Sequence, residues 1–416
     1  MALFKGKLKA PVSKSSSLRA LICCALSFEY PQYIIRNIST CNDVKVGIAV
    51  IKQLRNFECR FDGNDLIITN INDFKRVEKI ELDVGECGFL ARVLASLSTY
   101  FADEITMVGK GTILKRELGI SEFVQNLGLT STSSQLPTTI KGQVNPGNYT
   151  LQANNSSQFI SGLFFLLPLL KSDSKLILQD SVSKPYLDLT LHYLKLSGIE
   201  FTTNSELNEV SIRGNQSYAK QEFTPESDWS SLSYLIALGL LNGDLLIENI
   251  HDRAELPDRA VLAILKEIGG DYEFINPTTL QVKKSDYSGF TFDLTNSPDL
   301  APLLAALAIG ATSPSRLSHC YRLQHKESNR LNSIIELLSA LQVKHNYDEQ
   351  SDVLTIFPTQ PQGGKVKTFN DHRIAMAALI LNAISSEPIS IDNYECIGKS
   401  YPDFVADLNS LGVNYE

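Results

Sequence analysis

Six stretches of the chain share one pattern of hydrophobic and polar positions. Each stretch begins with small, polar or acidic residues and continues with Leu, Ala, Ile and Phe on nearly every side of a helix. The stretches are about 70 residues apart and begin at Ser15, Gly88, Ser156, Asp228, Pro298 and Asp371. Apolar residues all round a helix are typical of a buried helix. The pattern therefore predicts six buried helices in six similar units.

Two further kinds of segment lie between these helices. Short apolar runs typical of strands occupy residues 65–70, 174–180, 244–250, 353–358 and 388–393. Longer periodic segments predict a second helix in each unit, and examples are 188–199, 258–270 and 330–343. A unit of this length exceeds a solenoid repeat of roughly 20 to 45 residues. We therefore expect compact α/β units gathered into globular domains.

Composition narrows the classes of protein that fit. The chain has 416 residues, 43% of them hydrophobic, which is enough for two or three domains with buried cores. Its 38 basic and 46 acidic side chains give a formal net charge of −8. That charge argues against nucleic acid or an anionic membrane as the main partner.

Cysteine usage and hydropathy indicate the compartment. The seven cysteines include no C-x-x-C pair, and no histidines have zinc-ligand spacing. We therefore expect neither a disulfide framework nor a metal site, and a reducing compartment fits best. The N-terminal sequence is not typical of a signal peptide. No apolar run reaches the roughly 18 residues that a membrane span needs. The protein is expected to be cytoplasmic.

The predicted helix starts also carry positive charge. A Ser-rich start taken alone is an ordinary helix N-cap. A buried helix also points N–H groups and a partial positive charge out of the core, so several such ends could converge on an anion. Arg19, Arg92 and Arg373 interrupt runs that are otherwise fit for burial, and a buried cation needs a partner. A local site for a small anion is therefore compatible with the net negative charge.

Two charged clusters in the C-terminal half add candidate chemistry. Lys326, Glu327 and Arg330 would share one side of a helix, although the same spacing is that of a surface ion-pair ladder. The sequence Asp-His-Arg at 371–373 stands at the head of a predicted buried helix, where a surface ladder is less plausible. A single histidine there is weak evidence of catalysis, and no second histidine has metal spacing.

With these residues in order, the chain resembles the 5-enolpyruvylshikimate-3-phosphate synthase family. The resemblance runs from about Lys14 to Asp403. Its motifs follow the family's order and lie at residues 13–19, 85–92, 115–116, 156–158, 183–186, 298–299, 326–330, 370–373 and 399–403. Any one of them is weak evidence, but nine in order are strong.

The resemblance implies a fold and a domain organisation. The family fold is a two-domain, inside-out, barrel-like α/β architecture of six βαβαββ units, three per domain, with buried helices. By analogy, residues 1–20 and 227–416 form a discontinuous domain and residues 21–226 an inserted domain. Hinge crossings are expected near residues 20 and 226, and closure of the domains would exclude water. A monomer is expected.

The resemblance also implies a reaction. The 5-hydroxyl of shikimate 3-phosphate attacks C2 of phosphoenolpyruvate, and the resulting tetrahedral intermediate expels phosphate. The two small-molecule substrates are polyanions, so several fixed cations must converge on them. No cofactor and no metal are required. Glyphosate, which occupies the phosphoenolpyruvate site of many members, is a possible inhibitor.

Site residues are carried over from the family motifs. The residues implied for shikimate 3-phosphate are Lys14, Ser15, Arg19, Ser156, Ser157, Gln158, Ser183, Tyr186, Asp299 and Lys326. The residues implied for phosphoenolpyruvate are Lys14, Gly88, Arg116, Gln158, Arg330, Arg373 and Lys399. The residues implied for catalysis are Asp299, Glu327, Lys14, Lys326, His372 and Lys399. The two carboxylates would share the proton transfers to and from the 5-hydroxyl and the methylene carbon, and the sequence leaves open which does which.

Four positions depart from the usual family pattern. Glu86 and Phe89 stand where the family usually has Asn and Thr, Glu117 replaces a Pro, and Asn329 replaces an Asp. An acid facing phosphoenolpyruvate would weaken binding, so we expect Glu86 to turn away or to pair with an arginine such as Arg92. The bulk of Phe89 predicts weak glyphosate sensitivity.

Two alternatives stay open. One is the enolpyruvyl transferase that acts on UDP-N-acetylglucosamine and uses a mobile loop bearing a cysteine. The motifs at 183–186, 371–373 and 399–403 argue against it. The other is a non-catalytic homologue that binds phosphorylated ligands. That second alternative is disfavoured by the retention of Lys14, Asp299, Glu327 and Lys399.

Overall fold

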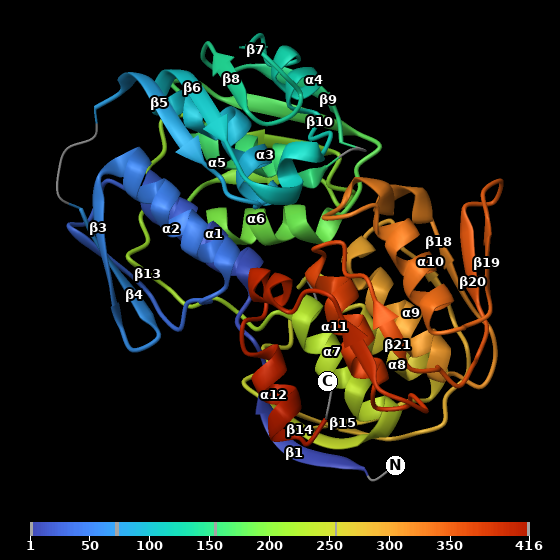
Figure 1. Ribbon diagram of the computed structural model, residues 1–416. Helices are drawn as coiled ribbons and strands as arrows, with labels where there is room; N and C mark the ends of the chain where they lie inside the picture. The colour runs from blue at the N-terminus through green and yellow to red at the C-terminus, as the bar shows by residue number, and fades with distance from the viewer. Residues whose placement is uncertain (1–2, 71–74, 154–155, 254–255, 414–416) are drawn as a thin grey trace. The chain divides into compact units, whose positions relative to one another are not determined.

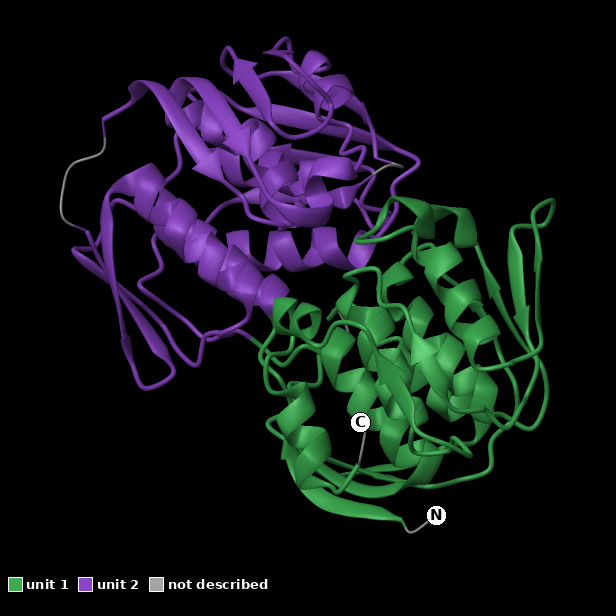
Figure 2. Cartoon of the chain, viewed as in Figure 1, with its two compact units in different colours: residues 1–13, 226–416 green, residues 14–225 purple. Residues whose placement is uncertain are grey.

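The chain forms two compact units. The computed structural model describes residues 3–70, 75–153, 156–253 and 256–413. Unit 1 comprises residues 1–13 and 226–416, and unit 2 comprises residues 14–225 (Figure 2). The first crossing between the units thus lies between Ser13 and Lys14, a few residues before the position expected from the sequence. That the crossings act as hinges stays a prediction.

Unit 2 is built from three α/β repeats with one four-stranded sheet each. The first repeat contains α1 (Lys14–Leu26), β2 (Gln32–Ile35), α2 (Asn42–Arg55), β3 (Phe57–Asp62), β4 (Asp65–Asn70) and, from the end of the unit, β13 (Glu222–Phe223). The second contains β5 (Val77–Asp83), α3 (Gly88–Leu97), β6 (Ala102–Val108), α4 (Ile120–Gln125), β7 (Thr130–Ser131) and β8 (Thr138–Lys141). The third contains β9 (Asn148–Gln152), α5 (Ser157–Leu166), β10 (Ser174–Gln179), α6 (Lys184–Leu196), β11 (Phe201–Thr203) and β12 (Glu209–Ile212).

Unit 1 also contains three repeats, and the third of them has a two-stranded sheet. Its first repeat contains β1 (Phe4–Lys9), α7 (Trp229–Asn242), β14 (Gly243–Glu248), α8 (Val261–Ile268), β15 (Asp271–Asn276) and β16 (Thr279–Lys283). The second contains β17 (Thr291–Asp293), α9 (Ala301–Gly310), β18 (Ser315–Ser318), α10 (Arg330–Ala340), β19 (His345–Asp348) and β20 (Val353–Ile356). The third contains β21 (Gly364–Val366), α11 (His372–Leu381), β22 (Ile389–Ile391) and α12 (Phe404–Ser410).

Every four-stranded sheet has the same topology. Each contains one parallel pair of strands, and a third strand lies antiparallel between this pair and the other edge strand, as in the order β5-β6-β8-β7. A parallel pair requires a crossover connection, and α3, α5 and α9 supply it for the pairs β5–β6, β9–β10 and β17–β18. Each of these three helices therefore follows the carboxyl end of the first strand of its repeat.

The crossover helices are buried and the sheets cover them. In unit 1, α7, α9 and α11 contact one another, and every residue of α7 and α11 is buried (Figure 1). In unit 2, α3 packs on α5, and both α1 and α5 pack on α6. All six predicted helices are present, as are the strands predicted at five places. The predicted inside-out α/β architecture is confirmed, and its polar helix starts emerge from apolar cores.

Candidate active site

Lys14 begins α1 and pairs with the first turn of α2. Its Nζ lies 3.1 Å from Asp43 Oδ2, and the two side chains are 15% and 6% exposed. A carboxylate in the first turn of a helix is also favoured by the helix dipole. Asp43 therefore holds the ammonium group of Lys14 at the start of α1.

Arg19 joins α1 to α6. The side chain is buried, and its Nε donates to Thr190 Oγ1 at 2.9 Å. Its Nη1 donates to the carbonyl of Ser15 and its Nη2 to the carbonyl of Tyr186, both at 3.0 Å. The Phe89 ring lies against the guanidinium, with Cζ 4.8 Å from the ring centroid. The structure thus brings together three residues that the motifs assign to shikimate 3-phosphate.

The start of α3 faces two guanidinium groups. A Cβ at Gly88 would lie 3.2 Å from Arg92 Nη1 and 3.8 Å from Arg116 Nη1, so the missing side chain leaves space beside both. Arg92 Nη1 also donates to Gln158 Oε1 at 3.0 Å, which links α3 to the start of α5. Backbone N–H groups at a helix start next to two cations suit an anion.

Three serines stand at the starts of α5 and α6, which pack together. Ser156 is the N-cap of α5, and its hydroxyl accepts a hydrogen bond from Gln158 N at 3.2 Å. Ser157 follows it and is buried. Ser183 precedes α6 with a φ of 55° and is also buried. The capping role expected for a Ser-rich start therefore applies to Ser156.

Asp299 is the focus of a charged cluster in unit 1. It lies in the 3₁₀ turn η4 (Pro298–Leu300) before α9. Its Oδ1 lies 3.3 Å from Lys326 Nζ and accepts from Arg330 Nη1 at 2.8 Å, and its Oδ2 accepts from Arg373 Nη2 at 3.2 Å. Burial opposes ionisation, but the charges of these cations outweigh it and hold the pKa of Asp299 well below its usual value. Asp299 is thus ionised over the whole neutral range.

Arg330 is the buried centre of the same cluster. The residue begins α10, and its side chain is 0% exposed. Besides Asp299 it donates to Glu327 Oε2 and, through Nε at 3.0 Å, to Asp371 Oδ2. A buried guanidinium surrounded by three carboxylates is fixed in place and fully compensated. The segment 326–330 is therefore not a surface ladder.

Lys326 has an environment that weakens its proton affinity. Burial lowers the pKa of its ammonium group, the charge of Asp299 opposes this, and Arg330 adds to the lowering. A lysine with a depressed pKa beside an ionised carboxylate can exchange a proton more readily than an exposed lysine.

The chain is similar to known proteins over nearly its whole length. A family model described as EPSP synthase (3-phosphoshikimate 1-carboxyvinyltransferase) matches residues 2–408. A 3-phosphoshikimate 1-carboxyvinyltransferase of Clostridium kluyveri is 32% identical over 413 residues, covering 98% of this chain and 95% of the relative. One of Clostridium acetobutylicum is 34% identical over 416 residues, with 98% and 95% covered. The chain belongs to the EPSP synthase family.

Solved structures of low identity show the same fold. An EPSP synthase from Acinetobacter baumannii is 20% identical with a TM-score of 0.79, covering 99% of this chain and 96% of that one. The enolpyruvyl transferase NikO from Streptomyces tendae is 16% identical with a TM-score of 0.74, covering 99% and 95%. The fold alone therefore does not separate EPSP synthases from other enolpyruvyl transferases.

The remaining two predicted residues of this EPSP synthase family member also lie in unit 1. His372 is buried at the start of α11, with Nδ1 4.0 Å from Asp371 Oδ1. Lys399 ends the 3₁₀ turn η6 (Glu395–Lys399), which packs against α11, and is 6% exposed. The predicted residues thus divide between the two units, with 14–186 in unit 2 and 299–399 in unit 1.

The four departures from the family pattern have local partners, and that of Phe89 is the guanidinium of Arg19. Glu86 Oε1 accepts from Thr112 N at 2.6 Å, and Glu117 accepts from Gln135. Asn329 is the exposed N-cap of α10, a position that Asn and Asp fill equally well.

Three residues absent from the predicted set take part in these clusters. They are Asp43, Arg92 and Asp371, each hydrogen-bonded or ion-paired to a predicted residue. The sequence does single out Arg92, since this cation interrupts an apolar run. Asp371 is the N-cap of α11 as well as a partner of Arg330, and the sequence shows only the first of these roles.

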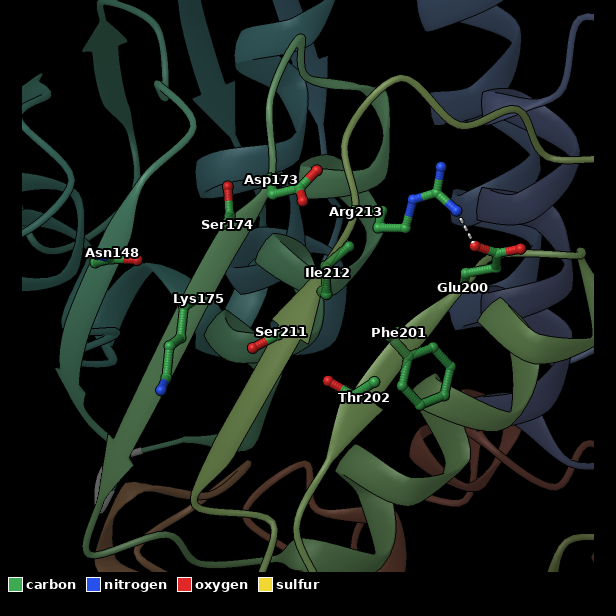
Figure 3. A pocket seen from close by; sticks show the side chains of 10 residues that line it. All are labelled: Asn148, Asp173, Ser174, Lys175, Glu200, Phe201, Thr202, Ser211, Ile212 and Arg213. Atoms are coloured by element: carbon green, nitrogen blue, oxygen red, sulfur yellow. Dashed lines mark hydrogen bonds and ion pairs between the residues drawn. The ribbon is translucent and has the colours of Figure 1, made fainter.

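A separate pocket lies on the sheet of the third repeat. It has a volume of about 350 Å³ and is lined by residues of β9, β10, β11 and β12 and the adjoining turns (Figure 3). Lys175, Thr202 and Ser211 line it, and Arg213 pairs with Glu200 at its side. It includes none of the residues that the EPSP synthase motifs predict, so it carries no part of the proposed chemistry.

Two further observations bear on the expectations from sequence. Within residues 3–70, 75–153, 156–253 and 256–413, no group of three His, Cys, Asp or Glu side chains could hold a metal ion. No helix in that part of the chain is both long and apolar enough to span a membrane.

Proposed function

We propose that this chain transfers the enolpyruvyl group of phosphoenolpyruvate to the 5-hydroxyl of shikimate 3-phosphate and releases phosphate. The observation that carries this proposal is the ionised Asp299 held by three cations at family motif positions. Each cation about 4 Å from a substrate phosphate or carboxylate would contribute roughly 4 kcal/mol at an effective dielectric near 20.

Cations at the family's motif positions are the proposed partners of the substrate anions. In unit 1, the carboxylates of Asp299, Glu327 and Asp371 compensate Lys326, Arg330 and Arg373. In unit 2, Lys14, Arg92 and Arg116 supply positive charge, with Asp43 as one compensating acid. We assign shikimate 3-phosphate and phosphoenolpyruvate to the residues that the motifs predict, with Arg92 added.

The chemistry requires one proton to leave and another to arrive. The oxygen of the 5-hydroxyl forms a bond to C2 of phosphoenolpyruvate as its proton passes to a base, and the methylene C3 gains a proton. The C2–O bond to phosphate then breaks as C3 loses a proton, which leaves the enol ether and free phosphate. No oxidant or reductant is consumed, so no redox cofactor is needed.

Asp299 and Glu327 are the proposed proton carriers. Asp299 is ionised and lies 3.3 Å from Lys326 Nζ, so the pair can accept the hydroxyl proton. Glu327 is bonded to Arg330 and is the second carboxylate of the cluster. Lys14, His372 and Lys399 would stabilise charge or position the substrates.

The decisive experiment is phosphate release from phosphoenolpyruvate with either of two acceptors. We expect release with shikimate 3-phosphate and none with UDP-N-acetylglucosamine. Asp299→Asn should lower kcat by about a hundredfold or more, since it removes a general base. Asp293→Asn, which changes an exposed carboxylate six residues earlier, is the matched control and should leave kcat within about twofold.

Other outcomes would replace the proposal. Turnover with UDP-N-acetylglucosamine alone would assign the chain to the other transferase activity, and no turnover with either acceptor would indicate a binding protein. We further propose that the chain acts as a cytoplasmic monomer and is inhibited weakly by glyphosate. The same phosphate assay, with glyphosate in competition with phosphoenolpyruvate, measures the latter.

A further inference from the structure

Two loops of unit 2 are joined at the carboxyl ends of β5 and β6. Val84 N donates to Val108 O and Lys110 N donates to Gly85 O, both at 2.9 Å. These bonds extend the parallel pairing of the two strands by one step beyond each strand end. The loop that carries Glu86 and the 3₁₀ turn η2 (Gly111–Lys115) are therefore held side by side.

The carboxylate of Glu86 accepts two hydrogen bonds from this turn. Its Oε1 accepts from Thr112 N at 2.6 Å and from Thr112 Oγ1 at 3.1 Å. Gly111 has a φ of +66°, and any side chain there would collide with Glu86 Oε1. The turn is thus shaped to admit the carboxylate.

The hydroxyl group of Thr112 is also hydrogen-bonded to Arg116. Arg116 Nη2 donates to Thr112 Oγ1 at 2.7 Å. A threonine hydroxyl has one hydrogen, and here the carboxylate takes it, so the hydroxyl oxygen is left as acceptor for Arg116. Successive hydrogen bonds that point the same way polarise and strengthen one another.

The orientation of Arg116 depends on this bond. Among the described residues, its Nε is buried and makes no hydrogen bond. Its Nη1 lies 3.8 Å from the place of a Cβ on Gly88, so that end faces the start of α3. One edge of the guanidinium is therefore held by Thr112, and the other faces the space beside Gly88.

We propose that Glu86 is a positioning residue that acts through Thr112 to aim Arg116 at phosphoenolpyruvate. The inference rests on the proposed function, which places phosphoenolpyruvate beside Gly88 and Arg116. It explains how an acid is tolerated in this loop: the carboxylate is occupied by the turn that holds the cation. The competing explanation is that Glu86 only stabilises the turn.

Steady-state kinetics of Thr112→Val separates the two explanations. Valine keeps the branched shape but removes the hydroxyl that joins Glu86 to Arg116. We expect the KM for phosphoenolpyruvate to rise about tenfold, the effect of one charge-assisted hydrogen bond, with kcat and the KM for shikimate 3-phosphate within twofold of wild type. Thr112→Ser keeps the hydroxyl and should restore the wild-type KM.

Glu86→Gln tests the carboxylate in the same chain. As a single substitution it should raise the KM for phosphoenolpyruvate by about threefold. Added to Thr112→Val it should cause no further rise, because both substitutions break the same series of hydrogen bonds from Glu86 to Arg116. Glu117→Gln, an exposed acid next to Arg116, is the matched control and should change nothing. Thermal unfolding of every variant reports whether the turn has been destabilised.

The contrary results are also distinct. An unchanged KM in Thr112→Val, parallel changes in both KM values, or full additivity of Glu86→Gln would overturn the inference. Arg116→Lys with an unchanged KM for phosphoenolpyruvate would overturn both the inference and the assignment of Arg116, with the reaction itself intact. If the wild type releases no phosphate, the proposed reaction fails, and calorimetric titration of phosphoenolpyruvate in the presence of shikimate 3-phosphate decides the inference instead. Equal affinities of wild type and Thr112→Val would then reject it.

Discussion

Two carboxyl groups of unit 1 have pKa values shifted in opposite directions. Asp299 is surrounded by cations that keep it ionised. Burial raises the pKa of Asp258 to about 6, and the charge of Asp299 adds to the rise against the opposing charge of Arg373. Ser230 donates a hydrogen bond to Asp258. The two carboxyl groups thus differ in protonation because Asp258 is almost completely buried, whereas three cations surround Asp299.

The raised pKa of Asp258 predicts a pH-dependent stability. Because the pKa is higher in the folded than in the unfolded chain, stability is full below pH 4 and falls as the pH rises to about 6. Asp258→Asn removes this loss, and Asn tolerates the φ of +62° at this position. We expect the variant to gain about 2 to 3 kcal/mol over wild type between pH 4 and 7.5.

Urea unfolding at a series of pH values measures this gain. Asp286→Asn, which makes the same change at an exposed position, is the control. A constant difference for Asp258→Asn would show that this carboxyl has the same pKa in the folded and the unfolded chain.

Individual residues were predicted by their chemical type and not by their partners. The family motifs identify Lys14 and Arg330, and Arg19, Arg92 and Arg373 are conspicuous as cations in apolar segments. The motifs do not identify Asp43 or the link from Glu86 to Thr112, because each pair is formed by residues more than 20 positions apart in the sequence. Glu86 was expected to turn away from phosphoenolpyruvate or to pair with an arginine. In the structure its carboxylate accepts hydrogen bonds from the backbone N–H and the hydroxyl of Thr112.

The start of α11 combines a helix cap with an ion pair. Asp371 is completely buried, and its Oδ1 accepts from Arg373 N at 3.0 Å as the N-cap. Its Oδ2 accepts from Arg330 Nε at 3.0 Å and from Ser328 Oγ at 3.1 Å. One side chain therefore fixes the starts of α10 and α11 relative to each other.

This double role predicts a large loss of stability on substitution. Asp371→Asn keeps an oxygen for the cap but removes the charge opposite buried Arg330, so we expect a loss of about 3 kcal/mol in the free energy of unfolding. Asn329→Ala removes the uncharged cap of α10 and should lose about 1 kcal/mol. Urea midpoints followed by circular dichroism compare the two. Equal losses would mean that the charge of Asp371 contributes nothing.

Elements were predicted more reliably than single contacts. The strand predicted at 65–70 has those bounds in the structure, and the helix predicted from Gly88 begins there. Apolar segments of this length report burial directly. Short strands such as β13 and β7 were not predicted, because two residues carry no periodicity. Their places are set by the sheets that they join.

Two strands come from the far ends of their units' sequences. β1 pairs in parallel with β14 in unit 1, although more than 200 residues separate them. β13 pairs in parallel with β2 in unit 2 and ends next to the second crossing. Each completes a sheet within its own unit, so unit 2 is a continuous segment with three whole sheets. Unit 1 is discontinuous and needs residues 1–13.

The topology predicts that unit 2 folds alone and that β13 is required for its stability. Fragment 14–225 contains all three sheets and their buried helices, so we expect it to unfold cooperatively. Fragment 14–220 lacks β13, whose Phe223 is 1% exposed and stacks on Tyr193 with ring centroids 5.9 Å apart. It also loses the hydrogen bonds that Ile34 N and Arg36 N donate to residues 221 and 223.

Removal of one buried aromatic side chain lowers the free energy of unfolding by about 3 to 5 kcal/mol, which is a large part of the stability of a domain of this size. Urea unfolding of the two fragments, followed by circular dichroism, should therefore give a lower midpoint for 14–220, or no folded baseline at all. Phe223→Leu in fragment 14–225 keeps the backbone pairing and should fall between the two. Equal midpoints for both fragments would show that β13 adds nothing to unit 2, and an unfolded 14–225 would show that unit 2 depends on unit 1.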